Sequence, residues 1–302
     1  MKADRRCVRT WILQLLPFIC LIIISGCGRG TETAESAVTA QIKNGEWFYN
    51  AFDIRQKNIY DAFRISAEDP FGQQLIPITD DNGQEAGIPV GDIDTVYQGF
   101  IYDHPEMFWL GQTYSYRFCG SDDNGETADA VAVIPIPETA EELAHLNEEF
   151  AASADRILEK IGEQDSDEEF ARSVYDLLAG ETEYTGEAMY DDAMRMQHTA
   201  YGAIVDKKAV CDGFALAYRY LLSLKGIPCL VVPGVSEGNP HTWNIAEWDG
   251  HWHEADLTWD ASLKNESGSR YFDLTTGEMQ KDHTRETEGI AALIPETDNQ
   301  EN

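Results

Sequence analysis

Basic residues are scarce in this chain of 302 residues, which has 22 lysines and arginines against 54 aspartates and glutamates. The formal net charge of −32 argues against a nucleic-acid partner, because phosphate binding needs clustered lysine and arginine side chains. It also argues against electrostatic attachment to anionic lipids. The acidity mainly favours solubility and says little about the substrate.

A long apolar run of membrane-spanning length is also lacking. The run from Trp11 to Ile24 has fourteen residues and contains Pro17, whereas a transmembrane helix needs about 20 apolar residues. Because it follows a basic segment, the run is typical of a signal peptide. Its end, Ser25-Gly26-Cys27, resembles the bacterial lipobox, where the signal is cut before a cysteine that is then acylated. We therefore expect an extracytoplasmic protein, lipid-anchored to the bacterial cell membrane through Cys27; an ordinary cleavage site or an uncut anchor helix are the alternatives.

Cysteines are few beyond the predicted signal and lipidation site. Those that remain are Cys119, Cys211 and Cys229. Three cysteines are too few for a fold that is stabilised mainly by disulfides. The fold must therefore be stabilised by a hydrophobic core, which the 43% apolar content permits. A disulfide between Cys119 and Cys229 would leave Cys211 free, and two separate buried thiols are the other possibility.

The first half of the chain predicts a mixture of helices and strands. Helical periodicity runs from Trp47 until before Pro70, and a short helix is expected over 93–102. Alternating apolar residues at 114–118 and 131–133 predict two strands joined around the Asp-Asp-Asn-Gly tetrad at 122–125. The same tetrad occurs at 80–83. Its Asn-Gly pair is a turn signal, and the EF-hand spacing fails, so a calcium site is the weaker interpretation.

Further along the chain, helical patterns alternate with capping and turn signals. A long amphipathic helix is expected after Pro137, and a capping box at 166–169 starts a second helix. A third apolar stripe begins at Phe214 and ends before Gly226, which places Cys211 in the first turn of that helix. Unpaired N–H groups and the positive end of the helix dipole favour a thiolate there. A small buried core residue is the alternative role for this cysteine.

The residues after this helix predict a strand and a hairpin. Apolar residues over 227–235 favour a buried strand, and Asp249-Gly250 predicts a two-residue turn between strands over 241–248 and 251–257. In that register Asp256 faces Trp243, so His241 and Asp256 lie on the same side of the sheet as diagonal neighbours. A base held by a carboxylate is what activation of a thiol requires. The same register directs His253 to the opposite face and leaves His251 at the turn, and a metal site built on these two lacks further ligands.

These blocks resemble, in order and spacing, the transglutaminase-like superfamily. The matching segments are AVCDGFALAYRYLL (209–222), GIPCLVVPG (226–234), HTWN (241–244), WHEADLTWD (252–260) and YFDLTTGEMQKDHTR (271–285). The resemblance is strongest over 165–285, and a looser likeness, including DHPEMFWL (103–110), reaches back to about residue 90. It implies an α+β, papain-like core in which the helix that carries Cys211 packs on an antiparallel sheet.

The resemblance also divides the chain and assigns roles. Together with the composition of the two chain ends, it predicts a signal peptide at 1–26, a polar tether at 27–45, an α/β extension at 46–136, a catalytic domain at 137–285 and an acidic tail at 286–302. Cys211 would be the nucleophile, His241 the base and Asp256 the residue that orients it. The Cys211 N–H is one expected oxyanion donor. Tyr201 is a candidate for the second, because Val205 stands where papain-type enzymes place a glutamine; Trp243 and Trp259 are expected to wall the site.

The resemblance leaves three functions open. A peptidase or amidase would hydrolyse amide bonds of a protein or peptide at the cell envelope through a thioester, and a γ-glutamyltransferase would pass the acyl group to an amine. A non-catalytic surface module that retains the fold is the third. Hydrolysis is favoured because the chain shows no extra β-sandwich domains such as those of the large animal cross-linking enzymes. No cofactor and no metal is expected.

Overall fold

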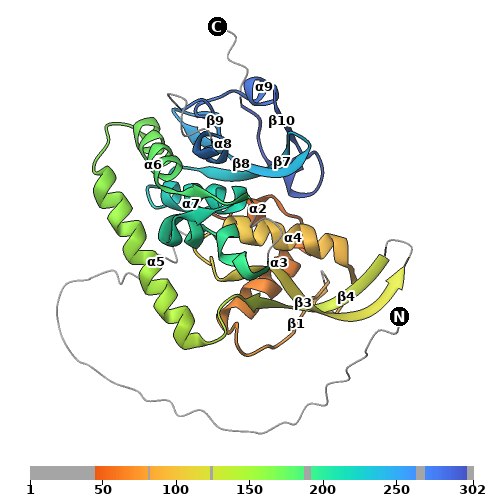
Figure 1. Cartoon of the computed structure of the whole chain (residues 1–302). Helices are drawn as coiled ribbons and strands as arrows, with labels where there is room; N and C mark the ends of the chain where they lie inside the picture. Colours follow the sequence, from red (N-terminus) through yellow and green to blue (C-terminus); the bar gives the residue numbers. More distant parts are fainter. Residues whose placement is uncertain (1–44, 81, 123–124, 187–191, 263–268, 298–302) are drawn as a thin grey trace, which may run out of the picture.

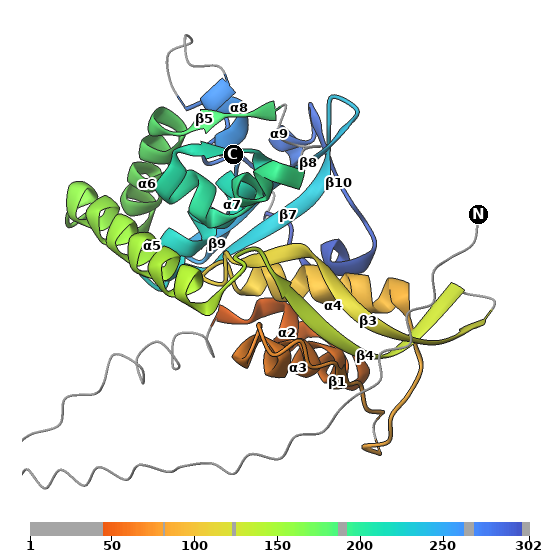
Figure 2. The same cartoon turned by 60° about the horizontal axis from the view of Figure 1, so that its bottom comes forward.

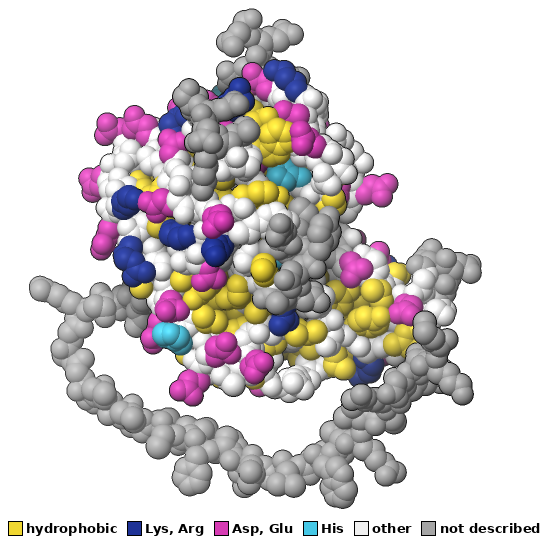
Figure 3. Space-filling view, viewed as in Figure 1, with side chains coloured by type: hydrophobic (Ala, Val, Ile, Leu, Met, Phe, Trp, Pro, Cys, Tyr) yellow, Lys and Arg dark blue, Asp and Glu magenta, His cyan; other side chains and the backbone are white. Residues whose placement is uncertain are grey.

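The computed structural model describes residues 45–80, 82–122, 125–186, 192–262 and 269–297. Figure 1 shows two groups of elements, the N-terminal extension in orange and yellow and the core in green and blue. The predicted signal peptide, tether and lipidation site lie outside the described residues. Within them, no helix is long and apolar enough to cross a membrane. Acidic side chains are spread over the face seen in Figure 3.

The extension consists of short helices packed on an antiparallel sheet. Its elements are α2 (Trp47–Ala51), α3 (Ile54–Glu68), β1 (Ile76–Pro77), β2 (Ile88–Pro89), α4 (Val90–Asp103), β3 (Leu110–Asp122) and β4 (Gly125–Pro135). The single helix predicted before Pro70 is wrong: it is broken at Asp53, whose side chain starts α3 through a capping box with Gln56. Strand β4 pairs with β1, β2 and β3, and the β3–β4 hairpin projects to one side in Figure 2.

The core opens with the two predicted helices and then packs α7 on a four-stranded sheet. Its elements are α5 (Ala140–Ile161), α6 (Asp167–Glu181), β5 (Glu183–Tyr184), η2 (Asp192–His198), η3 (Gly202–Asp206), β6 (Lys208–Ala209), α7 (Cys211–Ser223), β7 (Cys229–Ser236), β8 (Asn239–Trp248), β9 (His251–Ala255), α8 (Leu257–Ser262), α9 (Thr276–Met279), β10 (His283–Arg285) and η4 (Gly289–Leu293). At the predicted capping box, Ser166 accepts from the Glu169 N–H, whereas the Glu169 carboxylate accepts from the Asp165 N–H and not from Ser166. The sheet has the order β10-β7-β8-β9 and is antiparallel throughout. A helix on an antiparallel sheet is the α+β arrangement expected from the sequence.

The β8–β9 hairpin has the predicted register. Asn244 pairs with Ala255 and Trp248 with His251, and both turn residues, Asp249 and Gly250, have positive φ angles of 54° and 77°, as a type I′ turn requires. Strand β9 is shorter than predicted, because it ends at Ala255 and the chain turns into α8. Asp256 therefore stands at the junction of strand and helix.

Strand β10 completes the sheet from a distant part of the sequence. It pairs with β7, and His283 lies opposite Ser236. Gly234 makes this approach possible: a Cβ there would lie 2.4 Å from the Thr284 carbonyl oxygen and 2.5 Å from the Trp243 ring, closer than van der Waals contact allows. The packing of β10 thus depends on a glycine in β7.

A buried ion pair joins the extension to the core. Arg219 of α7 donates to Asp103 at the end of α4 over 3.1 Å, and the Asp103 side chain is fully buried. Asp103 also accepts hydrogen bonds from the backbone of Phe48 and Tyr49 and from the Tyr60 hydroxyl. Asp103, the first residue of the DHPEMFWL segment, thus links α4 to α7.

One other expectation from the sequence is corrected, and one alternative that it left open is decided. The segment after residue 285 is not a free acidic tail as far as residue 297, because the Glu286 N–H bonds to the Pro233 carbonyl over 3.0 Å and Ile290 of η4 is buried. Cys119 and Cys229 form no disulfide. Both are free thiols, Cys119 exposed and Cys229 buried.

Candidate active site

Cys211 is the first residue of α7, a helix of 13 residues. Val210 before it is extended and no side chain caps the helix, so backbone N–H groups of the first turn are available at the nucleophile's position. The Cys211 side chain is buried with 5% exposure, yet it lines a cleft. A buried thiol at a helix N-terminus and at the edge of a cleft fits a nucleophile better than a packing residue.

His241 connects the thiol to Asp256. Its Nε2 donates to the Asp256 Oδ2 over 2.7 Å, and the Cys211 thiol is near enough to the ring to help raise its pKa. Burial lowers the pKa of His241, but the charge and hydrogen bond of Asp256 outweigh burial and raise that pKa to about 10. The ring is therefore an imidazolium at neutral pH, suited to pair with a thiolate.

Asp256 is held as a buried anion by four donors. Its Oδ1 accepts from the backbone N–H groups of Thr258 at 2.8 Å and Trp259 at 3.2 Å, so it caps α8. Its Oδ2 accepts from His241 and from His283, at 2.7 and 2.9 Å. Burial raises the pKa of this carboxyl group, but its two histidine partners lower it below the usual range. Both oxygens are thus fully engaged.

His283 was missed as a site residue by the sequence analysis. Its segment, YFDLTTGEMQKDHTR, was noted as part of the resemblance. The register of the β8–β9 hairpin, however, says nothing about where β10 lies, so it could not place His283 beside Asp256. A carboxylate shared by two buried histidines brings three metal-ligating atoms within 4.8 Å of one another. The described contacts among them are direct N–H···O hydrogen bonds, and the second Asp256 oxygen is taken by backbone N–H groups, so the arrangement fits a hydrogen-bonded row better than a metal site.

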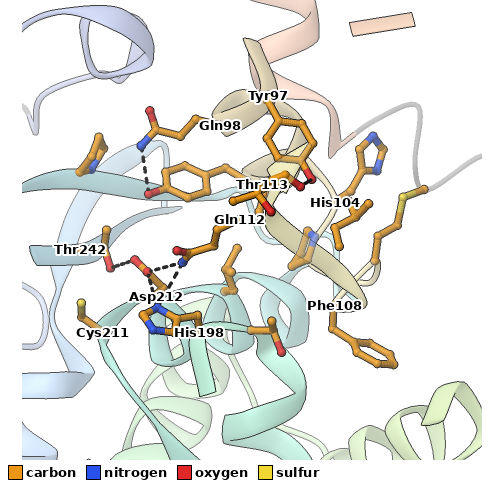
Figure 4. Close-up of a pocket in the computed structure, with 18 of the residues that line it drawn as sticks. Tyr97, Gln98, His104, Phe108, Gln112, Thr113, His198, Cys211, Asp212 and Thr242 are labelled. Carbon is orange, nitrogen blue, oxygen red and sulfur yellow. Dashed lines mark hydrogen bonds and ion pairs between the residues drawn. The ribbon is translucent and has the colours of Figure 1, made fainter. Parts of the chain in front are cut away.

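The cleft beside Cys211 has a volume of about 1150 Å³ and lies between the extension and the core (Figure 4). One wall comes from α4 and β3 of the extension and the other from η2, α7 and the β7–β8 hairpin. Its polar lining residues near the thiol are Gln98, Tyr102, Gln112, His198, Asp212, Thr242 and Glu286. A ligand in this cleft would touch both parts of the chain.

Asp212 gathers a second polar cluster in the cleft. Its carboxylate accepts from Thr242 over 3.0 Å and from the Gln112 amide over 3.0 Å, and it lies 3.1 Å from the His198 Nδ1 (Figure 4). Gln112 belongs to β3 of the extension, so this cluster joins the two walls next to the thiol. The sequence analysis assigned no role to Gln112 or His198, because their proximity to Cys211 depends on how the extension packs against the core.

Comparisons with known proteins agree with this geometry. Residues 155–258 match the model of the transglutaminase-like superfamily, and the segment contains Cys211, His241 and Asp256. This chain has a transglutaminase-like domain. The fold class predicted from the sequence is therefore confirmed.

Curated relatives are similar to part of this chain. The chain is 27% identical over 148 residues to the kyphoscoliosis peptidase of Mus musculus, covering 42% of this chain and 22% of that protein. It is 31% identical over 77 residues to the Homo sapiens protein of the same name, covering 22% of this chain and 12% of that protein. The chain thus spans about a fifth or less of these relatives. A solved structure of a TGase aligns with a TM-score of 0.36 at 18% identity, covering 57% of this chain and 49% of that one.

The other residues that the sequence analysis assigned to the site are Tyr201, Trp243 and Trp259. Tyr201 is not placed to donate to an oxyanion: its hydroxyl donates to Glu149 over 2.8 Å and its ring packs on Phe108 and Phe150. Trp243 stacks on His241 with ring centroids 6.1 Å apart, and Trp259 packs on His283 at 5.2 Å. These tryptophans enclose the histidines and do not line the cleft.

His253, on strand β9 of the hairpin, lies apart from this site, as the hairpin register predicts. His253 stacks on Trp248 with ring centroids 4.2 Å apart, and its Nδ1 lies 2.7 Å from Asp273. It belongs to a separate histidine–aspartate pair in the same domain. That pair provides a matched control for the row formed by His241, Asp256 and His283.

Proposed function

We propose that the protein is a thiol enzyme that cleaves amide bonds of a protein or peptide through a Cys211–His241–Asp256 triad. The observation that carries this proposal is the hydrogen bond of His241 to the buried Asp256, with His241 and the Cys211 thiol both lining the cleft. A nucleophile, a base and a carboxylate that orients the base are the parts that acyl transfer through a covalent intermediate needs.

The chemistry follows from the position of each group. The Cys211 sulfur attacks the amide carbonyl carbon, and the carbonyl oxygen becomes an oxyanion to which the Cys211 N–H can donate. His241 gives its proton to the departing amine as the C–N bond breaks, which leaves a thioester. Water then attacks that thioester while His241 takes its proton, and the acid and free thiol are released. Asp256 stays ionised and stabilises the imidazolium whenever His241 carries the proton.

Hydrolysis is preferred over amine transfer because the mouse relative carries the name of a peptidase. The decisive experiment incubates the purified chain with casein and a fluorescent primary amine and follows both products by mass spectrometry. We expect new peptide termini that are absent with Cys211→Ala. Amine incorporation at glutamine without cleavage would instead assign γ-glutamyl transfer. Neither product, from a folded protein whose Cys211 is no more reactive than Cys119, would favour a binding module.

We also propose that the enzyme works at the cell envelope, anchored by lipid on Cys27. Support comes from the apolar run and the Ser25-Gly26-Cys27 end of the predicted signal. Expression of the full chain in a bacterium should place it in the membrane fraction with an acylated Cys27, and Cys27→Ala should release it. Membrane retention with an unmodified Cys27 would overturn the lipid anchor.

A further inference from the structure

His283 sits at the centre of an aromatic enclosure beneath the triad. It is the first residue of β10 and is 1% exposed. Its ring packs against Trp243, Trp259 and Tyr271, with centroid distances of 5.1, 5.2 and 5.7 Å. The enclosure excludes water from the ring, so its polar atoms depend on protein partners.

Both ring nitrogens of His283 face carboxylates. Nδ1 lies 2.6 Å from Asp282 Oδ1, and Nε2 lies 2.9 Å from Asp256 Oδ2. Only the imidazolium has two N–H donors, and an ionised carboxylate can only accept. The ring is therefore a buried cation. Burial lowers the pKa of His283, but hydrogen bonds and charges of the two carboxylates raise it on balance.

The same carboxylate oxygen serves both histidines. Asp256 Oδ2 accepts from His241 and His283, and the two rings are 5.4 Å apart. The bond from His283 prevents the carboxylate from turning away from His241. Its positive charge opposes the charge on His241, because two like charges at this distance in a buried place repel.

We propose that His283 is a positioning residue that aims Asp256 at His241 and limits how tightly His241 holds its proton. The proposal rests on the proposed function of the triad. A base whose pKa is raised too far by its carboxylate cannot accept a proton near neutral pH, so a second cation on that carboxylate makes His241 a better base. His283 thus acts through Asp256 and not on the substrate.

Several titratable groups surround His283 and share this electrostatic setting. The set comprises His241 of β8, Asp256 at the β9–α8 junction, Asp282 beside β10, Tyr271 whose hydroxyl donates to Asp282 over 2.8 Å, and the Glu254–Arg285 ion pair, whose glutamate accepts from the Trp243 indole. A test must therefore change His283 alone and keep its hydrogen bond to Asp256. His283→Gln does so, since the amide can donate as Nε2–H does but carries no charge.

The test measures alkylation of Cys211 by iodoacetate from pH 4 to 10.5, with the site resolved by mass spectrometry. The rate with this anionic reagent rises as the thiolate forms and falls as the His241 imidazolium loses its proton. We expect His283→Gln to move the falling limb up by about one pH unit, which is about a tenfold higher rate at a fixed pH on that limb. His283→Leu, which also removes the donor, should slow alkylation at pH 7 by about tenfold.

His253→Gln is the matched control, because it removes an imidazole ring from its contact with a carboxylate, that of Asp273, away from the triad. It should leave the profile unchanged. A His283→Gln profile that coincides with those of the wild type and His253→Gln, in proteins shown to be folded by circular dichroism, would overturn the role of His283 while leaving the triad intact. A wild-type Cys211 with no bell-shaped profile would overturn both proposals.

Discussion

Two histidine–aspartate pairs flank Cys211, and they differ in burial. The His241–Asp256 pair has side-chain exposures of 8% and 0%, and its contact distance is 2.7 Å. The His198–Asp212 pair has exposures of 13% and 23%, and its contact distance is 3.1 Å. The first pair lies on the sheet beneath the thiol, and the second lines the cleft that a substrate would enter.

This difference in burial separates their contributions. Charges interact more strongly where water is excluded, and the buried pair shows large opposite pKa changes, upward for His241 and downward for Asp256. The pair in the cleft is in contact with solvent, which screens its charges. We infer that the buried pair sets the protonation of the nucleophile, whereas the other joins the cleft walls through Gln112 and shapes substrate binding.

The two pairs should differ most in activity when the histidine of each is replaced. His241→Ala should lower the rate of casein cleavage by at least about 10³-fold, since no base then serves the thiol. His198→Ala should lower it by less than about tenfold. His253→Ala serves as a folded control without contact to the cleft. Equal losses for His241→Ala and His253→Ala would mean that the hairpin register or the triad is wrong.

Neutralising each aspartate tests the same contrast through charge alone. Asp256→Asn keeps the shape but removes the charge that stabilises the His241 imidazolium. A loss of about 10⁴-fold is known for a serine-protease triad, and a smaller loss is expected here because a thiolate also stabilises the imidazolium. Asp212→Asn should change KM more than kcat. A larger fall in kcat for Asp212→Asn than for Asp256→Asn would reverse the assignment.

Burial should also decide which contact holds the extension to the core. Asp103→Ala leaves the buried Arg219 charge unpaired and should lower the free energy of unfolding by about 3–5 kcal/mol. Gln112→Ala removes the exposed contacts of its amide with Asp212 and His198 and should cost about 1 kcal/mol. Urea unfolding measures both. Similar small losses from the two variants would show that the Asp103–Arg219 pair contributes little to stability.

The pH dependence of stability should carry the smallest effect. Because its folded-state pKa is raised to about 10, the stabilisation from His241 is complete below the unfolded value of about 6.5 and is lost as the pH rises towards 10. The melting temperature of the wild type should therefore exceed that of His241→Gln at pH 6, and the gap should narrow by pH 10. A gap that widens with pH would contradict the sign of this pKa change.

Local sequence signals account for the part of the site that lies within one hairpin. The Asp249-Gly250 turn sets the register of β8 and β9, and the two-residue period of a strand then places His241 and Asp256 on one side. The start of α7 was predictable because the apolar stripe from Phe214 has the period of a helix. The break at Asp53 was not foreseen, because the apolar period continues across it while the capping box interrupts the backbone.

Contacts between distant segments were decided only by the tertiary structure. His283 reaches Asp256 because β10 docks on β7 over Gly234, and Gln112 reaches Asp212 because α4 is tied to α7 through Asp103 and Arg219. The sequence by itself placed the proposed nucleophile, Cys211, at the start of a helix, and it placed His241 and Asp256 side by side through the register of one hairpin. It could not determine what surrounds them, because the pairing of separate elements depends on the complementarity of their packed surfaces, which no local pattern encodes.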